Sequence, residues 1–587
     1  MVDAVRGSAL EQNMLAQVSK DSLWTFVSTV AKDERMSGSP EEREAMRYVA
    51  DTLRSWDVDV LEYEHDGYVS RPVRSRLTIQ APEAMSIDST THSFARSGNY
   101  AGEIVYVGNG DEAGFAGKDV AGKVVLIEGL ATPGKTMSVE KHRAAGAIFI
   151  NDNNLHQMIV TPVWGTPTPA TSSLQPSILV ISIRLDDGTR LKSWLERGPV
   201  HVEIEAEVET GWARLPIVVG TITGAQDPDH FVMLAGHIDS WFYGAIDNAA
   251  ANATTLETMR ILAAHRDQLR RGFRVVFWSG HSHGRYAGST WYADNAWEDL
   301  YDHCVAYVNV DSTGAMQAVL YEEILAMPET ATLAKDVIAD LTGQTAEVNR
   351  VGRAGDQSFW GIGIPSVFMS LSRVPIETAP ELSRAMGALT GRKKSGQAWF
   401  WHTEHDTLDK IDLDVLQLDT KIYLSSILRL INSPILPFDY AATLDEIAGA
   451  LTHNQELAGA HLDLSTLITR AEALRAQLGR LNQRLASGVA PEHEADANQA
   501  LVDLGRILIP LNYTEAGQFE HDLALHAPAV PLLYEMHRLT KLDPASDDYR
   551  FLRTQLRRRV NQIAFTLNQA RRRVDQALSA LGPEGER

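Results

Sequence analysis

The chain has 587 residues, 44% of them hydrophobic, which is enough for about three globular domains with large cores. Its formal net charge of −22 argues against general affinity for nucleic acid or for an anionic membrane face. The single cysteine, Cys304, excludes an intramolecular disulfide, and no run of about 18 apolar residues is long enough to cross a bilayer. The first 20 residues lack the basic-then-apolar pattern of a signal peptide, so we expect a cytoplasmic protein without nucleic-acid or membrane partners.

Residues 8–57 are predicted to be helical. Within them, "SPEEREAMRYVADTLRSW" begins with Ser-Pro and carries glutamates in its first turn, as a helix N-terminus prefers. A strand, "VDVLEYEH", follows. From residue 94 to residue 208 come short β-rich runs such as "GKVVLIEG", each closed by Gly or Asn, with one helix among them. This pattern predicts a compact β-rich inserted domain over residues 94–208.

Strands and helices alternate from about residue 212 to residue 434. "HFVMLAGHID", "FRVVFWSG" and "CVAYVNVD" are predicted strands, and helical segments separate them. Such alternation is typical of an α/β fold with a mixed, mostly parallel sheet flanked by helices. Residues 1–93 and 209–434 are therefore predicted to form one α/β domain interrupted by the insert.

The last part of the chain, residues 435–587, follows the proline-marked linker "SPILPFDY" and is predicted to be a helical bundle. Two apolar stripes have helical spacing: Leu467, Ala471, Leu474, Leu478, Leu481 and Leu485, then Leu552, Leu556, Ile563, Leu567, Ala570 and Val574. The arginine triplets 557–559 and 571–573 are interpreted as solvated faces. A bundle of this kind offers a surface for homodimer formation.

Polar residues gather where the strands of the α/β domain end. They are His237, Asp239, Asp247, His281, His283, Asp311, His402, Glu404, His405 and Asp406. In an open α/β sheet, sites form at the carboxyl ends of the strands, so these side chains are expected to meet in one crevice. Imidazole and carboxylate groups together are suitable ligands for zinc.

The order of these motifs resembles the zinc aminopeptidase and glutamate carboxypeptidase family, whose relatives include the transferrin receptor. The resemblance rests on "ERMSGSPEEREAMRYVADTLRSW", "KHRAAGAIFIND", "GHIDSWFYGAIDNAAANA", "YVNVDS" and "GDQSFWGIGIPSV", and it covers nearly the whole chain. It implies a zinc-peptidase-like α/β domain, a protease-associated-like insert and a transferrin-receptor-like dimerisation domain. A homodimer is the assembly that this resemblance implies.

The resemblance also implies metal ligands. His237 and Asp311 match the terminal ligands of one zinc, Asp247 matches the carboxylate that bridges two zincs, and His402 matches a ligand of the second.

Three further positions match supporting or pocket residues of the family. Asp239 matches the acid of the His-x-Asp motif, which orients an imidazole. Asp356 matches a pocket residue near the substrate, and Trp401 stands where pocket-lining aromatics occur, although a structural aromatic is equally consistent there.

The stretch "FWSGHSHGRYAGS" departs from the family, which has two adjacent glutamates in this turn, a general base and a zinc ligand. Counting back from Gly288 and Ser289 places Ser282 at the base position and His283 at the ligand position. Asp247, His283 and His402 would then hold the second metal, and two histidines with one carboxylate suit zinc or non-haem iron.

The loss of the base has the larger consequence, because general acid–base catalysis is typically worth roughly 10²–10⁴-fold. Ser282 is interpreted as a spacer, a hydrogen-bonding site residue or, with less support, a nucleophile. His281, His405 and Glu404 are the candidates to replace the base, although His281 is also consistent with an exposed turn residue.

The leading hypothesis is a metal-dependent hydrolase that cleaves an amide-type (C–N) bond of a small or modified peptide-like substrate with metal-activated water. One or two zinc ions are expected, with iron, manganese, cobalt or nickel as alternatives. Two other functions stay open at this point: a lyase or Fe(II)-dependent enzyme on the same scaffold, and a non-catalytic, receptor-like protein.

Overall fold

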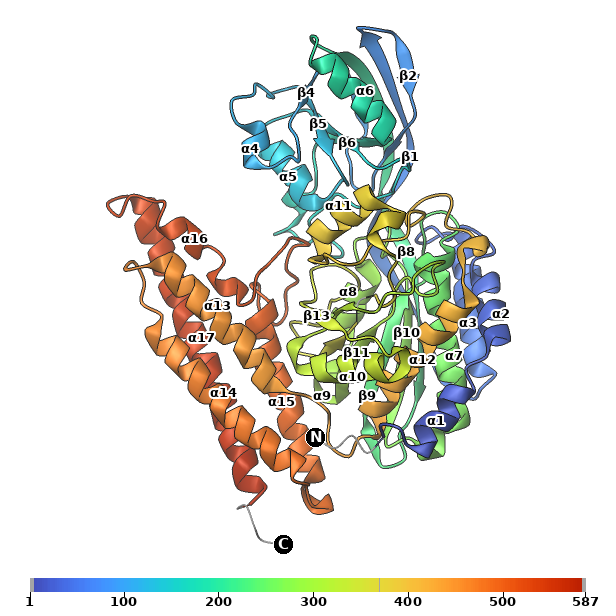
Figure 1. The fold of residues 1–587 in the computed structure, drawn as a ribbon, viewed down its shortest axis with the longest axis vertical. Helices are drawn as coiled ribbons and strands as arrows, with labels where there is room; N and C mark the ends of the chain where they lie inside the picture. The colour runs from blue at the N-terminus through green and yellow to red at the C-terminus, as the bar shows by residue number, and fades with distance from the viewer. Residues whose placement is uncertain (1–4, 369, 583–587) are drawn as a thin grey trace.

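The computed structural model describes residues 5–368 and 370–582. Figure 1 shows an α/β region, a smaller β-rich region at one end of it, and a group of long helices along its side. Within the described ranges, no helix is both long and apolar enough to cross a membrane.

Three helices precede the first strand. They are α1 (Ala9–Ala16), α2 (Lys20–Val30) and α3 (Pro40–Arg54). Helix α3 begins where the sequence predicts, because the Ser39 side chain accepts a hydrogen bond from the backbone N–H of Glu42 and Pro40 occupies the first turn.

The α/β region is built on parallel strands with one antiparallel neighbour. Its strands are β8 (His201–Ile222), β9 (Asp227–His237), β10 (Arg271–Trp278), β11 (Cys304–Asn309) and β14 (Ser366–Val367). The spatial order is β14-β11-β9-β10-β8, and only the β10–β8 pairing is antiparallel. Parallel strands present their carboxyl ends at one edge, which is where the candidate site lies.

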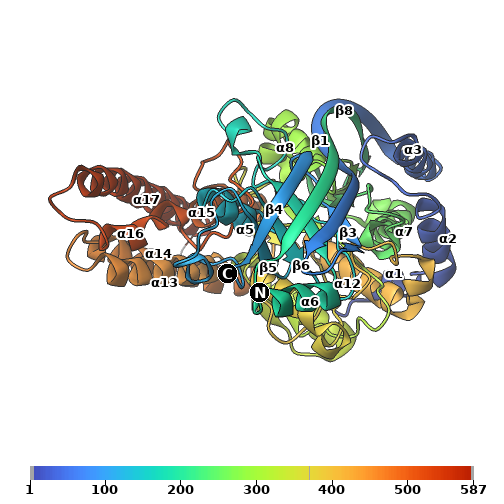
Figure 2. The same ribbon diagram turned by 90° about the horizontal axis from the view of Figure 1, so that it is seen from above.

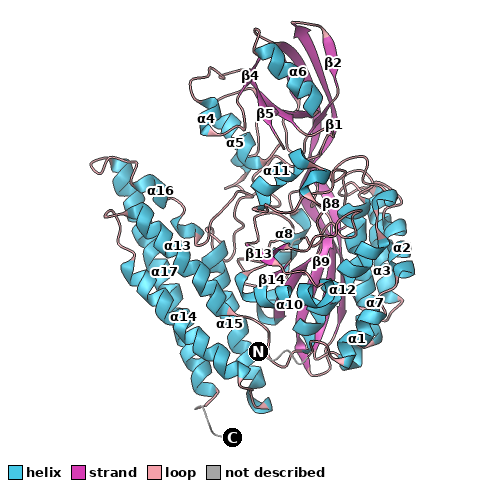
Figure 3. Cartoon of the chain, in the orientation of Figure 1, coloured by secondary structure: helices cyan, strands magenta, loops and turns pink. Residues whose placement is uncertain are grey.

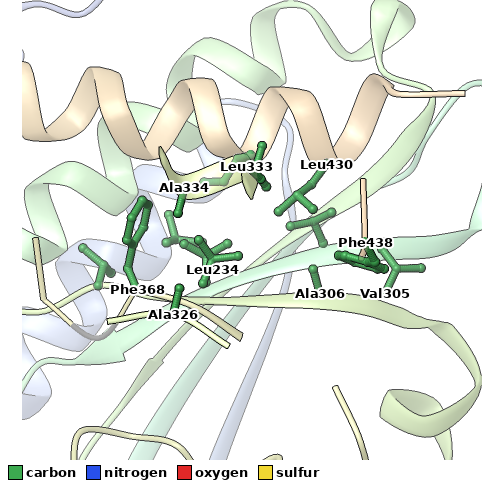
Figure 4. Packing of buried hydrophobic residues seen from close by; sticks show 14 of the residues in the cluster. Leu234, Val305, Ala306, Ala326, Leu333, Ala334, Phe368, Leu430 and Phe438 are labelled. Carbon is green, nitrogen blue, oxygen red and sulfur yellow. The ribbon is translucent and has the colours of Figure 1, made fainter. Parts of the chain in front are cut away.

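Helices cover both faces of this sheet. Phe231 and Met233 of β9 pack on the side of α8 (Ala287–Asn295) and α9 (Trp297–His303). Val232 and Leu234 point to the other face, in the core cluster that also contains residues of α2, α3, α7 (Ala251–Ala264), α10 (Ala331–Thr342) and α12 (Leu413–Asn432). Figure 4 shows Leu234 in this layer with Leu333 and Leu430. The predicted fold class is confirmed.

The β-rich region continues the same sheet. Strands β1 (Asp59–Ala81) and β8 pair along their whole length and carry the chain into this region (Figure 2). There the sheet continues through β4 (Gly98–Tyr106), β5 (Val124–Glu128), β6 (Gly146–Ile150), β7 (Leu179–Ile183) and β3 (Ser89–Thr91), and β2 (Met85–Ile87) pairs with β1. Its helices are α4 (Glu112–Phe115), α5 (Pro133–Lys141) and α6 (Leu185–Leu195).

Because one sheet runs through both regions, the expected limits of the inserted domain, residues 94 and 208, do not coincide with breaks in the sheet. Strand β3 pairs with β7, so the sheet of the β-rich region already includes residues before 94. Strand β8 passes residue 208 without a break. The division into domains stays a prediction.

The C-terminal part contains α13 (Tyr440–Ala458), α14 (Ser465–Ala486), α15 (Glu494–Tyr513), α16 (Met536–Leu539) and α17 (Asp547–Ala580), seen together in Figure 3. The buried residues of α14 are the six of the first predicted stripe, and all six of the second are buried on α17. The arginine triplets 557–559 and 571–573 are exposed or half-buried. The remaining strands are β12 (Glu323–Leu325) and β13 (Glu347–Asn349), and the remaining helix is α11 (Pro380–Thr390).

Glu329 lies where the α/β region meets α13. Its buried carboxyl group accepts a hydrogen bond of 2.7 Å from Thr443 Oγ1, and its backbone carbonyl accepts one of 2.9 Å from the N–H of Asp439. Burial raises the pKa of Glu329 to about 7. The folded protein therefore retains the proton over a pH range in which the unfolded chain releases it.

This raised pKa predicts a pH-dependent stability. Between about pH 4.5 and pH 7 the folded state binds more protons than the unfolded state, so the stabilising contribution of Glu329 is lost as pH rises through 7. The loss is on the order of 3 kcal/mol from this group. Glu329→Gln is expected to remove this part of the pH dependence, measured as urea-unfolding midpoints from pH 5 to pH 8. Parallel wild-type and variant curves would contradict the assignment.

Candidate functional site

The strand register brings His237 and Asp311 to the same level. His237 is the last residue of β9. Ala235, two residues before it, pairs with Asn309 of β11, so Asp311, two residues after Asn309, comes level with His237. His237 Nε2 lies 3.9 Å from Asp311 Oδ2. The imidazole ring of His237 is held in this orientation by a hydrogen bond, because its Nδ1 lies 2.8 Å from the backbone carbonyl oxygen of Asp239.

Asp247 lies between two imidazoles. Its Oδ1 is 3.1 Å from His237 Nε2 and its Oδ2 is 3.1 Å from His402 Nε2. Asp247 belongs to the short helical turn Ala245–Ala250 that leads into α7, and Asp406 supports this turn. The Asp406 carboxylate accepts hydrogen bonds from the backbone N–H groups of Ile246, at 2.9 Å, and Asp247, at 3.1 Å.

His281 joins this group from the turn after β10. Its ring stacks on that of His237, with centroids 3.8 Å apart and planes 14° apart. Its Nδ1 is 2.8 Å from Asp356 Oδ2, which leaves Nε2 free. His237, His281 and Asp311 each offer a ligand atom within 4.8 Å of the others. They are suitable donors for one metal ion.

The chemistry of this group fits a divalent cation. His237 Nε2 is buried and makes no hydrogen bond of acceptable geometry, although Asp247 Oδ1 is close. Burial and the charge of Asp247 raise the pKa of Asp311 to about 6. A divalent cation would occupy the free imidazole nitrogen and offset the repulsion between the two carboxylates. Nitrogen and oxygen donors of this kind are ordinary zinc ligands.

His283 is not among these three ligand residues. Its Nδ1 is 2.9 Å from Ser37 Oγ, which in turn donates to Asp239 Oδ2 at 2.7 Å, and its ring packs against Trp241 with centroids 4.3 Å apart. Burial lowers the pKa of His283 to about 4, so the ring is neutral. The ligand atoms that gather within 4.8 Å of one another in the described residues include His281 and not His283, and the expected set of Asp247, His283 and His402 stays a prediction.

The physical reason is the path of the turn. Asp239 accepts hydrogen bonds from the backbone N–H groups of His281, at 3.3 Å, and Ser282, at 2.8 Å. Gly280 has a φ of +80°, which lets the chain reverse directly after β10. The side chain of His281 then faces the crevice, whereas Ser282 does not line it. The count back from Gly288 that gives Ser282 and His283 their expected roles requires a turn that follows the same path as in the family.

Four other predicted residues are placed as follows. The side chains of Glu404 and His405 are 70% and 51% exposed, and neither lines the pocket described below. Trp401 lines that pocket and stacks on His402, with ring centroids 3.5 Å apart. Asp356 is buried behind His281 and accepts a second hydrogen bond, of 2.8 Å, from Ser289 Oγ.

A pocket of about 120 Å³ opens on this group. One end is lined by Asp247, His281, Asp311 and His402. All three parts of the chain contribute to its wall, including Pro133 and Ile159 of the β-rich region, Arg285 and Arg373 of the α/β region, and Ala524 of the C-terminal part.

Sequence reasoning missed the three pocket arginines, Arg285, Arg353 and Arg373, and the role of Asp406. Arg285 belongs to the same turn as His281, which was a usable signal. Arg373 follows the β14 region with no motif around it, and nothing in the sequence marks it. The sequence groups Asp406 with the polar residues at strand ends and indicates no role for it.

Comparison with known proteins agrees with this architecture. Residues 218–426 match the model of peptidase family M28. A probable glutamate carboxypeptidase of Zea mays is 24% identical over 488 residues, which cover 70% of this chain and 67% of that protein. The aminopeptidase NAALADL1 of Rattus norvegicus is 26% identical over 343 residues, 52% of this chain and 45% of the relative, so the alignment leaves more than half of that protein unmatched.

Solved structures show the same fold. An aminopeptidase from Aneurinibacillus sp. strain AM-1 superposes with a TM-score of 0.54 at 21% identity, covering 72% of this chain and 96% of that one. A zinc aminopeptidase from Bacillus subtilis gives a TM-score of 0.52 at 17% identity, covering 70% and 95%. The resemblance to the zinc-peptidase family is confirmed, and these matches support a metallohydrolase.

Proposed function

We propose that this protein, whose residues 218–426 match peptidase family M28, is a metal-dependent hydrolase that cleaves an amide-type bond of a small or modified peptide-like substrate. The observation that carries the proposal is the meeting of His237, Asp247, His281 and Asp311, of which the last three line a single pocket. The pocket is small and its wall comes from three parts of the chain, which favours a small substrate.

A first metal position would be held by His237 and Asp311, whose ligand atoms lie within 4.8 Å of that of His281, with Asp247, 3.1 Å from His237, as a further carboxylate ligand. A second position, between Asp247 and His402, would need a third protein ligand of the kind that catalytic zinc sites usually have, and no described group of three ligand atoms includes these two residues. We therefore favour one zinc ion, with manganese, iron, cobalt or nickel as alternatives. When bound, such an ion lowers the pKa of a water molecule and polarises the substrate carbonyl.

His281 supports the proposal as the group that replaces the missing glutamate base. Asp356 holds the Nδ1 side of the ring, so that Nε2 can accept a proton at the metal end of the pocket. Ser282 has no such position, because its backbone binds Asp239 and its side chain does not line the pocket. Asp356 is thus a positioning residue, and His281 is the candidate that receives the proton.

A homodimer formed through the C-terminal helices is part of the proposal. Phe551 and Phe565 on α17 are 70% and 63% exposed, and their spacing of two heptads places them on one face of the helix. Light scattering of the purified chain tests this assembly.

The first experiment is elemental analysis of protein purified without added metal or chelator, followed by a panel of amide, peptide, urea and lactam substrates. We expect about one equivalent of zinc per chain and hydrolysis of at least one amide class. Activity with iron alone would favour the Fe(II)-dependent alternative. Absence of any metal that binds and restores activity would favour the receptor-like alternative.

A further inference from the structure

We propose that the β-rich region positions His402 through a clamp formed by Gln157 and His156. The inference rests on the proposed hydrolase function and deepens it, because it makes the β-rich region a working part of the metal site. His402 lines the pocket beside Asp247, whereas Gln157 and His156 lie in the segment that follows β6. His156 is a positioning residue, because it acts on the site through Trp401 and His402.

His402 has a backbone conformation that needs support. Its φ is +60°, in the left-handed region that residues with a side chain rarely adopt. The backbone N–H of Gln157 donates to the His402 carbonyl oxygen at 2.9 Å, and the Gln157 carbonyl oxygen accepts from His402 Nδ1 at 2.6 Å. Gln157 is itself anchored on β3, since its Nε2 donates to Thr90 Oγ1 at 2.7 Å. One residue of the β-rich region therefore holds both the main chain and the side chain of His402.

The bond to the ring decides which nitrogen of His402 faces the pocket. A carbonyl oxygen only accepts hydrogen bonds, so Nδ1 carries the proton that it donates to Gln157. The other nitrogen, Nε2, points to Asp247 and lies 3.1 Å from its Oδ2. A hydrogen bond of this kind to a backbone carbonyl fixes the tautomer and the orientation of a metal-binding imidazole. The clamp therefore prepares His402 to bind a cation through Nε2.

His156 secures the same loop one residue earlier. Its Nδ1 lies 2.6 Å from the backbone carbonyl oxygen of Trp401, and its Nε2 lies 3.1 Å from Asp152 Oδ1. The side chain is fully buried, and both ring nitrogens face oxygen acceptors, so the ring is fixed at its two ends. Trp401 in turn stacks on His402, with centroids 3.5 Å apart. A displacement of Trp401 is therefore transmitted to the His402 ring.

Other residues of the metal site are supported differently. His237 is oriented by the backbone carbonyl of Asp239, and Asp247 by the Asp406 carboxylate, all within the α/β region. His402 instead receives its support from a segment of the β-rich region that is far away in the sequence. The β-rich region thus does more than form one wall of the pocket, because it sets the position of a residue that faces Asp247.

The test replaces His156 in the full chain and measures zinc affinity by competition with a chelator of known affinity. His156→Leu removes both hydrogen bonds of the ring, so zinc affinity is expected to fall by at least about 10-fold, as is typical when the support of a ligand is lost. His156→Asn keeps a donor toward the Trp401 carbonyl oxygen and is expected to restore the affinity to within about 3-fold of wild type.

Deuterium exchange of the metal-free protein gives a second readout. In His156→Leu, exchange is expected to rise in peptides that cover residues 398–407, which contain the supported loop, and to stay unchanged in peptides that cover residues 279–287. Because this measurement needs neither metal nor substrate, it tests the clamp independently of the hydrolase function. A rise spread evenly over the whole chain would overturn the proposal, since it would show loss of stability and no local support.

The matched control is His92→Leu, which also removes a buried histidine of the β-rich region. His92 Nε2 lies 2.7 Å from Ser182 Oγ of β7, and the residue does not line the pocket. Its zinc affinity is expected to stay within about two-fold of wild type, even where its melting temperature falls. Equal loss of zinc affinity in His92→Leu and His156→Leu, or no recovery in His156→Asn, would overturn the proposal.

A milder variant, Asp152→Asn, decides the question if His156→Leu does not fold. It weakens the support of the His156 ring without removing it, so zinc affinity is expected to fall by about 3-fold, and unchanged affinity and exchange would overturn the proposal. Hydrolysis is measured separately. A chain that loses zinc on replacement of His156 but hydrolyses no amide refutes the hydrolase proposal alone, and an active enzyme that His156→Leu leaves unaltered refutes the clamp alone.

Discussion

Replacing His281 by alanine is expected to lower kcat for amide hydrolysis by about 10²- to 10⁴-fold while most of the bound metal remains. The reason is that His237, Asp247 and Asp311 remain as ligands, whereas the imidazole held by Asp356 is lost. The measurement is kcat on the best substrate together with zinc content per chain. His405→Ala is the matched control, because this histidine lies in the same region but its side chain is 51% exposed.

Two outcomes would change the assignment. If His281→Ala loses its metal as well as its activity, His281 is a ligand and the base lies elsewhere. If kcat is unchanged, the ring has no part in the chemistry.

Asp356→Asn separates the positioning of the His281 ring by Asp356 from simple packing, because the amide keeps the shape of the side chain but holds the imidazole less well. The kcat of this variant is expected to fall and its pH profile to shift.

Replacing Asp247 by asparagine is expected to weaken metal binding by at least about 100-fold and to abolish measurable hydrolysis. Asp247 is the carboxylate that lies 3.1 Å from both His237 and His402, so either metal position loses a charged oxygen ligand. Substitution of groups that only support ligands already costs about 10–100-fold in metal affinity, and a ligand should cost more. The measurement is competition with a chelator of known affinity.

The control for this prediction is Asp406→Asn, which alters the support of Asp247 and leaves the ligands in place. Its effect on metal affinity is expected to be smaller than that of Asp247→Asn. Unchanged metal affinity in Asp247→Asn would remove this residue from the metal site.

Much of the architecture follows from local patterns. The six apolar residues of the α14 stripe are the ones that the structure buries, because a helical period of 3.6 residues is visible in any sequence. The strands that end at His237 and near Asp311 are continuous apolar runs, as parallel strands covered on both faces require. The carboxyl ends of such strands meet at one edge, so these two residues were placed together from the sequence alone.

The tertiary structure decided which of three consecutive residues faces the pocket. His281, Ser282 and His283 differ in direction because Asp239, from another strand end, holds two backbone N–H groups of the turn and Ser37, far away in the chain, binds His283. Arg285 and Arg373 likewise line one pocket although they belong to segments that have no common spacing. A sequence records the period of each element and the chemistry of each side chain, whereas the orientation of a turn is set by hydrogen bonds to partners that only folding brings near.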